Sequence, residues 1–294
     1  MIALWSFWSE PALKFGHSAW ATPLHHLLSW ILSVETAKKY FPETSLVTDS
    51  AGARMLIDGV GLNVTQVSTE LDSLSGIDPQ WWALGKLYAY RSQARPFIHI
   101  DSDVYLWNGL PDAALGAPVI TQNPEDFTVG ESWYHPEKFD LIKNRGGWIP
   151  EELDWFRSLG VRQKAECCGV MGGTGNEFIS YYADRAINLV QNPVNKMLWP
   201  EIGIDNILVE QYFLSACFEF HRSSPEKRFG PLEMAYIFGS SEEAFTPEAA
   251  RQAGYTHLIG GAKKNPVLMK RLEKRVERDY PFLFDRCLRY VRGL

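Results

Sequence analysis

The sequence is poor in the features that mark membrane, secreted and nucleic-acid-binding proteins. Among its 294 residues no apolar run reaches the roughly 18 residues that cross a bilayer, and the N-terminus lacks the basic region of a secretion signal. The formal net charge of −6 argues against general nucleic-acid binding, which needs a positive surface. We therefore expect a cytoplasmic protein with no nucleic-acid partner.

Cysteine is scarce, with four residues at 167, 168, 217 and 287 and no Cys-x-x-Cys spacing. Adjacent cysteines rarely bridge each other without strain, so we expect reduced, buried thiols. The glycine-rich run at 172–176 lacks the Lys-Ser/Thr pair of a P-loop and is a weak nucleotide signal.

Strand and helix patterns alternate over the first hundred residues. Strands are expected at 2–8, 45–49, 63–67 and 97–100, and helices at 24–40, 51–58 and 79–93. This order predicts an α/β fold with a Rossmann-like, mainly parallel central sheet flanked by helices. Ligands of such sheets bind beyond the carboxyl ends of the strands.

The middle of the chain, about 110–160, is dense in Pro, Gly, Asn and Trp and is expected to be irregular, as in long functional loops. Helical periodicity returns at 177–191 and 206–220. We expect one continuous domain with two halves, 1–110 and 111–294.

The triplet Asp101-Ser102-Asp103 follows the strand expected at 97–100. Residues two apart in an extended chain point the same way, so both carboxylates can face one Mg²⁺ or Mn²⁺ ion. A turn that hydrogen-bonds its own backbone is the competing interpretation. The side chain of His99 points to the same side as those of Asp101 and Asp103, but His99 lies deeper in the strand, and we interpret it as a core residue.

A second motif, His257-Leu-Ile-Gly260-Gly-Ala-Lys263, lies near the C-terminus. With the Asp triplet it resembles the retaining glycosyltransferases of the GT-A fold, closest to the family 8 type (glycogenin-like and bacterial galactosyltransferases). The resemblance implies that His257 completes a metal site, that Gly260 lets the backbone approach a diphosphate and that Lys263 neutralises it. The chain departs from the family after Lys263, where the family usually continues with Pro-Trp.

The same resemblance implies roles for other residues. Lys86, on the helix before the triplet, is similar to a basic residue of this family and of family 32, and would reach the sugar or phosphate. Glu210 would bind sugar hydroxyls, and Gln211 would lie near the reacting carbon. The alternative for all three is a solvated polar side chain.

Three positions complete the predicted donor site. Ser102 lies between the two aspartates, and Trp5 and Asp49 lie where strands end. We expect Trp5 to stack on the nucleotide base and Asp49 to bind the ribose, with core packing as the alternative for Trp5.

The predicted reaction moves a hexose from a nucleoside-diphosphate sugar, expected to be a UDP-sugar, to an acceptor hydroxyl. The acceptor would be a glycan, a lipid-linked sugar or a small molecule. Imidazole beside two carboxylates favours Mn²⁺ over Mg²⁺. Two alternatives stay open, a non-catalytic sugar-nucleotide or glycan-binding protein and a haloacid-dehalogenase-type phosphohydrolase, although the latter expects Thr or Val where this chain has Tyr105.

The C-terminal segment 264–294 carries nine basic and four acidic residues and several aromatics. It is typical of a solvated helix that closes the fold, or of a tail that contacts anionic lipid at the inner face of the membrane.

Overall fold

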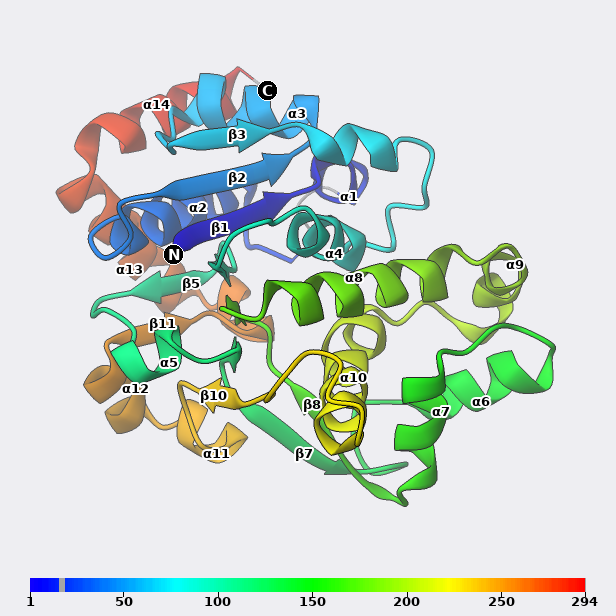
Figure 1. The fold of residues 1–294 in the computed structure, drawn as a ribbon. Helices are drawn as coiled ribbons and strands as arrows, with labels where there is room; N and C mark the ends of the chain where they lie inside the picture. Colours follow the sequence, from blue (N-terminus) through cyan, green and yellow to red (C-terminus); the bar gives the residue numbers. More distant parts are fainter. Residues whose placement is uncertain (16–18, 294) are drawn as a thin grey trace. The chain divides into compact units, whose positions relative to one another are not determined.

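The computed structural model describes residues 1–15 and 19–293, so Leu294 of the predicted basic tail lies outside the described residues. The chain has an α/β structure with a seven-stranded, mainly parallel sheet flanked by helices, which confirms the predicted class (Figure 1). The spatial order of the strands is β10-β6-β9-β4-β1-β2-β3. In chain order they are β1 (Ile2–Phe7), β2 (Thr44–Thr48), β3 (Gln66–Ser68), β4 (Phe97–Ile100), β6 (Val119–Thr121), β9 (Val170–Gly173) and β10 (Met234–Tyr236).

The chain forms two compact units, each assembled from separate segments. Unit 1 comprises Met1–Pro79, His99–Leu110 and Ala250–Leu294, and unit 2 comprises Gln80–Ile98 and Pro111–Ala249. The expectation that 1–110 is a nucleotide-sugar-binding half and 111–294 an acceptor-binding half remains a prediction.

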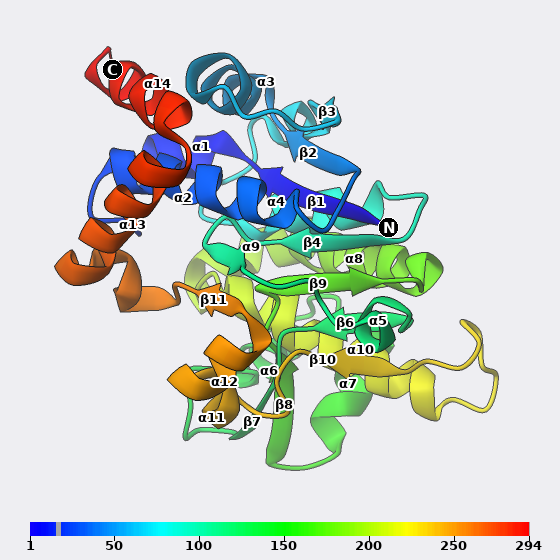
Figure 2. The ribbon, with the colours of Figure 1, turned by 90° about the vertical axis from the view of Figure 1, so that its left-hand side faces the viewer.

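Unit 1 is built on β1, β2 and β3, which pair in parallel in that order. Helix α2 (Pro23–Ala37) begins after Thr22, whose side chain accepts a hydrogen bond from the backbone N–H of His25. Helices α13 (Pro266–Asp279) and α14 (Pro281–Arg292) both pack against α2 and lie beside it in Figure 2. Because α2 also contacts β5 (Val104–Leu106), most residues of α2 are buried.

The helix expected at 51–58 is divided in the structure. It starts as α3 (Ser50–Ala53) and continues as a π-helical turn, η1 (Arg54–Val60), that ends at Gly61 in the left-handed conformation, with a φ of 86°. The other elements here are α1 (Ser9–Lys14), η2 (Glu70–Leu74) and α12 (Pro247–Ala253).

Unit 2 pairs β6 in parallel with β10 and antiparallel with β9. A separate antiparallel ribbon joins β7 (Pro124–Thr128) to β8 (Arg162–Glu166). Helix α4 packs on α8, and α7 packs on α10. The helices of this unit are α4 (Ala83–Arg91), α5 (Asp112–Leu115), α6 (Glu137–Asn144), α7 (Glu151–Ser158), α8 (Asn176–Gln191), α9 (Pro193–Ile202), the π-helical η3 (Leu208–Tyr212), α10 (Phe213–Ser223) and α11 (Ser241–Ala244).

The segment 110–160, expected to be irregular, instead contains two strands and three helices, α5 to α7. These elements are only three to eight residues long, and many of their positions are exposed. Short, half-exposed elements give little hydrophobic periodicity, which is why the sequence did not predict them.

All four cysteines are buried, as predicted, and none of them forms a disulfide. Within the described part of the chain, no helix combines the length and apolar character required to cross a membrane.

A buried polar network lies in unit 2 around Glu166, which is fully enclosed. Its carboxylate accepts hydrogen bonds from Ser215 Oγ (3.1 Å) and the Tyr236 hydroxyl (3.4 Å), and Lys164 Nζ lies 3.2 Å away. Lys164 also pairs with Glu219 at 2.9 Å. Burial raises the pKa of Glu166 from its ordinary value of 4.5 to about 7, although the Lys164 ammonium opposes the shift.

We expect the folding stability conferred by Glu166 to fall as the pH rises. The folded carboxyl binds its proton more tightly than the unfolded one, so its contribution is complete below pH 4.5 and is lost through pH 7. The loss should be on the order of 2–3 kcal/mol. Glu166→Gln, which mimics the protonated acid, removes this dependence. Urea unfolding of both proteins at pH 5 and pH 8 tests it, and equal pH effects in the two proteins would contradict it.

Candidate metal centre

The Asp-Ser-Asp turn (101–103) follows β4 and is joined to a distant part of the chain by a two-stranded antiparallel ribbon. Strand β5 (Val104–Leu106) pairs with β11 (Tyr255–His257), and the register sets His257 opposite the first residue of β5. The residue after β11 donates its backbone N–H to the Asp103 carbonyl oxygen at 3.0 Å. Backbone pairing within unit 1 therefore brings the histidine to the aspartates.

Asp101, Asp103 and His257 offer three ligand atoms that all lie within 4.8 Å of one another. Asp103 is buried, whereas Asp101 and His257 are partly exposed, so the cluster is open on one side. His99 Nδ1 lies 3.6 Å from Asp101 Oδ1, and its Nε2 is 3.0 Å from Ser6 Oγ. His99 is buried, as predicted, and its ring helps to orient Asp101.

Helix α2 fixes the backbone of the turn. Ser29 Oγ donates to the Ser102 carbonyl oxygen at 2.6 Å, and Ser33 Oγ donates to the Asp101 carbonyl oxygen at 3.0 Å. Ser33 in turn accepts a hydrogen bond from Trp5 Nε1 at 2.9 Å. Sequence reasoning missed these two serines, although their spacing of four within the otherwise apolar stretch 27–34 was the available signal.

Lys263 lies on η4 (Gly260–Lys264), the single turn that follows β11. Its Nζ is 2.6 Å from Asp103 Oδ2 and 5.6 Å from the centre of the Trp20 ring. Gly260 has a φ of 52°, a backbone conformation that favours glycine, and the space beside its Cα is open. The turn thus combines an ammonium group with an uncovered stretch of backbone.

Two opposing effects act on Asp103. Burial raises the pKa of its carboxyl, but the charges and hydrogen bonds of His257 and Lys263 outweigh burial and hold that pKa well below its ordinary value. Asp103 is therefore an anion at neutral pH. Two carboxylates and an imidazole are a ligand set that fits Mn²⁺ and, less well, Mg²⁺.

Trp5 and Asp49, also expected at the donor site, make other contacts in the structure. The Trp5 ring is fully buried, so neither of its faces is open to a nucleotide base. Asp49 caps α3 by accepting from the Gly52 backbone N–H (2.6 Å), and it accepts from both the backbone N–H and the hydroxyl of Ser9 (2.9 and 2.8 Å). The structure thus assigns both residues to packing and capping.

The remaining predicted residues belong to unit 2 and contact one another or neighbours there. Lys86 Nζ lies 2.9 Å from Glu210 Oε1, and the Glu210 side chain is fully buried. The Tyr134 hydroxyl donates to Gln211 Oε1 at 2.5 Å and also contacts Glu125. The pairing of Lys86 with Glu210 brings together two residues predicted separately, while their contacts with a sugar remain predictions.

A family model described as a family of unknown function (DUF6734) matches residues 1–290. The chain belongs to this family. No curated protein matches this DUF6734 member. The match spans the Asp triplet, His257 and Lys263, and it assigns them no chemistry.

The geometry of this DUF6734 chain predicts that Lys263 competes with a metal ion for Asp103. We expect Lys263→Met to tighten Mn²⁺ binding about three- to tenfold in the absence of nucleotide, because a positive charge 2.6 Å from a ligand oxygen opposes a cation. Asp103→Asn should weaken binding at least tenfold. Calorimetric titration with Mn²⁺ measures both effects.

Lys264→Met is the matched control, because Lys264 is the exposed neighbour on the same turn. Unchanged affinity in Lys263→Met, or an equal gain in Lys264→Met, would contradict the competition.

Proposed function

We propose that the protein is a metal-dependent retaining glycosyltransferase of GT-A type that moves a hexose from a nucleoside-diphosphate sugar, expected to be a UDP-sugar, to an acceptor hydroxyl. The observation that carries the proposal is the convergence of Asp101, Asp103 and His257. Lys263 contacts the Asp103 carboxylate of this cluster. The α/β class and the position of the cluster directly after β4 support it.

The charge of the cluster suits a diphosphate only when a cation is bound. Asp101 and Asp103 contribute two negative charges and Lys263 one positive charge, which leaves a net charge of −1 with a neutral His257. A divalent ion raises this to +1, which attracts an anionic diphosphate. When bound, Mn²⁺ or Mg²⁺ would supply Lewis-acid stabilisation of the leaving phosphate oxygen.

The protein's own groups hold the diphosphate in place. Lys263 exchanges its contact with Asp103 for a phosphate oxygen, where an ammonium stabilises the charge that develops as the sugar departs. The open backbone at Gly260 and Gly261 lets phosphate oxygens approach closely, because neither position carries a side chain. Ser102 lies between the two aspartates and is partly exposed to the same side.

In the transfer, the bond between the anomeric carbon and the phosphate oxygen breaks and leaves its electrons on the diphosphate. The acceptor oxygen forms a bond to the same face of the sugar, and its proton passes to the departing phosphate oxygen. The roles of Lys86, Glu210 and Gln211 toward a sugar, which the family resemblance implies, are part of the proposal, and in the structure Lys86 Nζ lies 2.9 Å from Glu210 Oε1.

The basic tail is proposed to contact anionic lipid at the cytoplasmic face of a membrane. Val267 on α13 and Phe282 on α14 leave 60% and 68% of their surfaces exposed beside the basic residues of these helices. Apolar and basic side chains on one helical segment suit a charged lipid surface. A lipid-linked acceptor would then be presented at the same lipid surface. Glycans and small molecules are the other proposed classes of acceptor.

Release of UDP from UDP-glucose, UDP-galactose and UDP-N-acetylglucosamine in the presence of Mn²⁺ tests the function. We expect turnover with at least one donor, loss of turnover with EDTA, and a fall in kcat/KM of at least about 100-fold in Asp103→Ala, because the change removes a metal ligand. Asp112→Ala, an exposed aspartate of unit 2, is the control and should be unaffected.

The alternatives predict other outcomes. Tight UDP binding with no turnover would indicate a binding protein, and phosphate release from sugar phosphates would indicate a phosphohydrolase. Either result would overturn the transferase proposal.

A further inference from the structure

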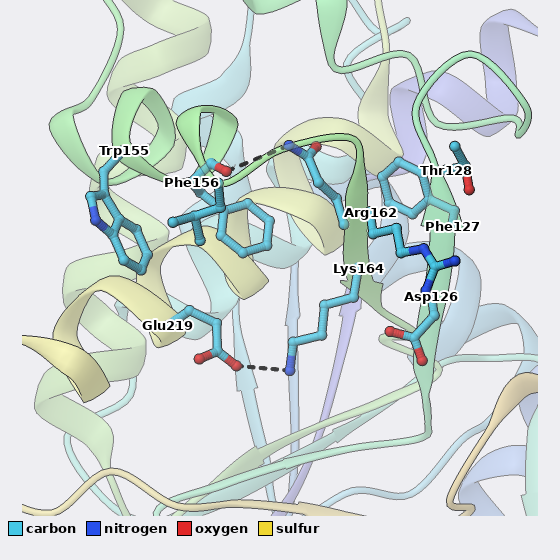
Figure 3. A pocket seen from close by; sticks show the side chains of 10 residues that line it. Asp126, Phe127, Thr128, Trp155, Phe156, Arg162, Lys164 and Glu219 are labelled. Atoms are coloured by element: carbon cyan, nitrogen blue, oxygen red, sulfur yellow. Dashed lines mark hydrogen bonds and ion pairs between the residues drawn. The ribbon is translucent and has the colours of Figure 1, made fainter.

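Unit 2 contains a hollow of about 730 Å³ between the β7–β8 ribbon, helix α7 and helix α10 (Figure 3). Its volume lies in the range of roughly 300–1,000 Å³ that small-ligand sites occupy. All of its lining residues belong to unit 2, so its shape is set within that unit.

Aromatic rings form much of its wall. Trp155 and Phe156 lie on one side in Figure 3, and Phe127 lies on the other. Trp155 packs edge-to-face against Phe220, with ring centres 5.6 Å apart, and Phe127 stacks on Tyr134 at 4.9 Å. These contacts hold the rings in place, and Trp155 stays partly exposed to the hollow. The wall therefore provides a fixed flat apolar surface.

Four polar groups of the hollow lie on one face of the ribbon, and Gln163 and Glu219 complete its polar lining. Asp126 pairs in register with Lys164, and Thr128 pairs with Arg162, so these four side chains project to the same side. Figure 3 shows Arg162 and Asp126 across the hollow from Trp155.

Two of the four charged groups of the hollow pair with each other, and the other two have no side-chain partner in the described part of the chain. Lys164 is held by Glu219 at 2.9 Å, next to the buried Glu166. Among residues 1–15 and 19–293, by contrast, neither the Asp126 carboxylate nor the Arg162 guanidinium has a side-chain partner. Asp126 and Arg162 are both exposed, so the hydroxyls of a ligand can replace the water around this acceptor and this forked donor.

The charge balance of the hollow selects among ligand classes. Asp126 and Glu219 offset Arg162 and Lys164, so the lining carries no net charge. An anion would be opposed by two carboxylates, and a purely apolar molecule would remove water from Asp126 and Arg162 without replacing its hydrogen bonds, which is costly. The class that fits is an uncharged molecule with an apolar face and many hydroxyls.

We propose that this hollow binds a neutral oligosaccharide, with a sugar ring stacked on Trp155 and its hydroxyls bonded to Asp126 and Arg162. The site needs neither a donor nor a metal ion and is thus independent of the proposed transfer. If transfer also occurs, the hollow is a place where a glycan acceptor is held.

A glycan array with neutral and acidic oligosaccharides, probed with the full chain in EDTA and without nucleotide, identifies the ligand. Saturation-transfer NMR then measures the affinity of the best neutral ligand. We expect Trp155→Ala to raise its dissociation constant at least tenfold and Trp155→Phe to raise it less. Asp126→Asn and Arg162→Gln should each raise it about three- to tenfold.

Trp133→Ala is the matched control, because Trp133 belongs to unit 2, is 65% exposed and does not line the hollow. Circular dichroism of each variant checks folding. Absence of any bound neutral glycan, preference for acidic glycans, or loss of binding in Trp133→Ala but not in Trp155→Ala would overturn the proposal. The glycan-binding assay contains no sugar donor, so it does not depend on the transfer activity. A failure of transfer would therefore not contradict glycan binding, and a failure of glycan binding would not contradict transfer.

Discussion

The antiparallel pairing of β5 with β11 is the interaction on which the metal cluster depends. Its register sets His257 opposite Val104, and the turn that follows carries Lys263 back to Asp103. The pairing consists of backbone hydrogen bonds, and it is anchored by Thr36 of α2, whose hydroxyl accepts from a backbone N–H of β5 at 3.2 Å. A shift of one residue in this register would turn the imidazole to the opposite face of the ribbon.

Burial of Asp103 imposes the second constraint. A buried carboxylate is costly unless a cation or hydrogen-bond donors compensate for its lost hydration, and here Lys263 and His257 do so. A divalent ion would provide the same compensation and would compete with the Lys263 ammonium for the same oxygens. Under the proposed function, a metal ion on Asp103 would free Lys263 for a phosphate oxygen, and metal binding and diphosphate binding would then be coupled through one set of contacts.

The local sequence was sufficient to predict the position of the aspartates but not the position of His257 or the short elements within 110–160. The aspartates were predictable because a buried strand precedes them and alternate residues share a face. The position of His257 came only from a family resemblance, since a three-residue strand has no periodicity to indicate its partner. Trp5 and Asp49 show the converse problem: Trp5 lies within β1 and Asp49 directly follows β2, and the structure uses the indole for core packing and the carboxylate for capping. The strands and helices within 110–160 escaped prediction because they are short and half-exposed.

The two units differ in charge balance, and that difference determines which ligand each one suits. The cluster in unit 1 has unequal charge, because its two carboxylates exceed the one ammonium. The hollow in unit 2 has two groups of each sign, three of them on one face of the ribbon and Glu219 on α10, and this balance favours the proposed hydroxyl-rich neutral ligand. A sugar nucleotide and a neutral glycan differ in the same way, one being an anion that requires a metal and the other an uncharged chain. The proposed transfer needs both kinds of surface, and the cluster and the hollow that would provide them lie in different units, which are assembled from different segments of the chain.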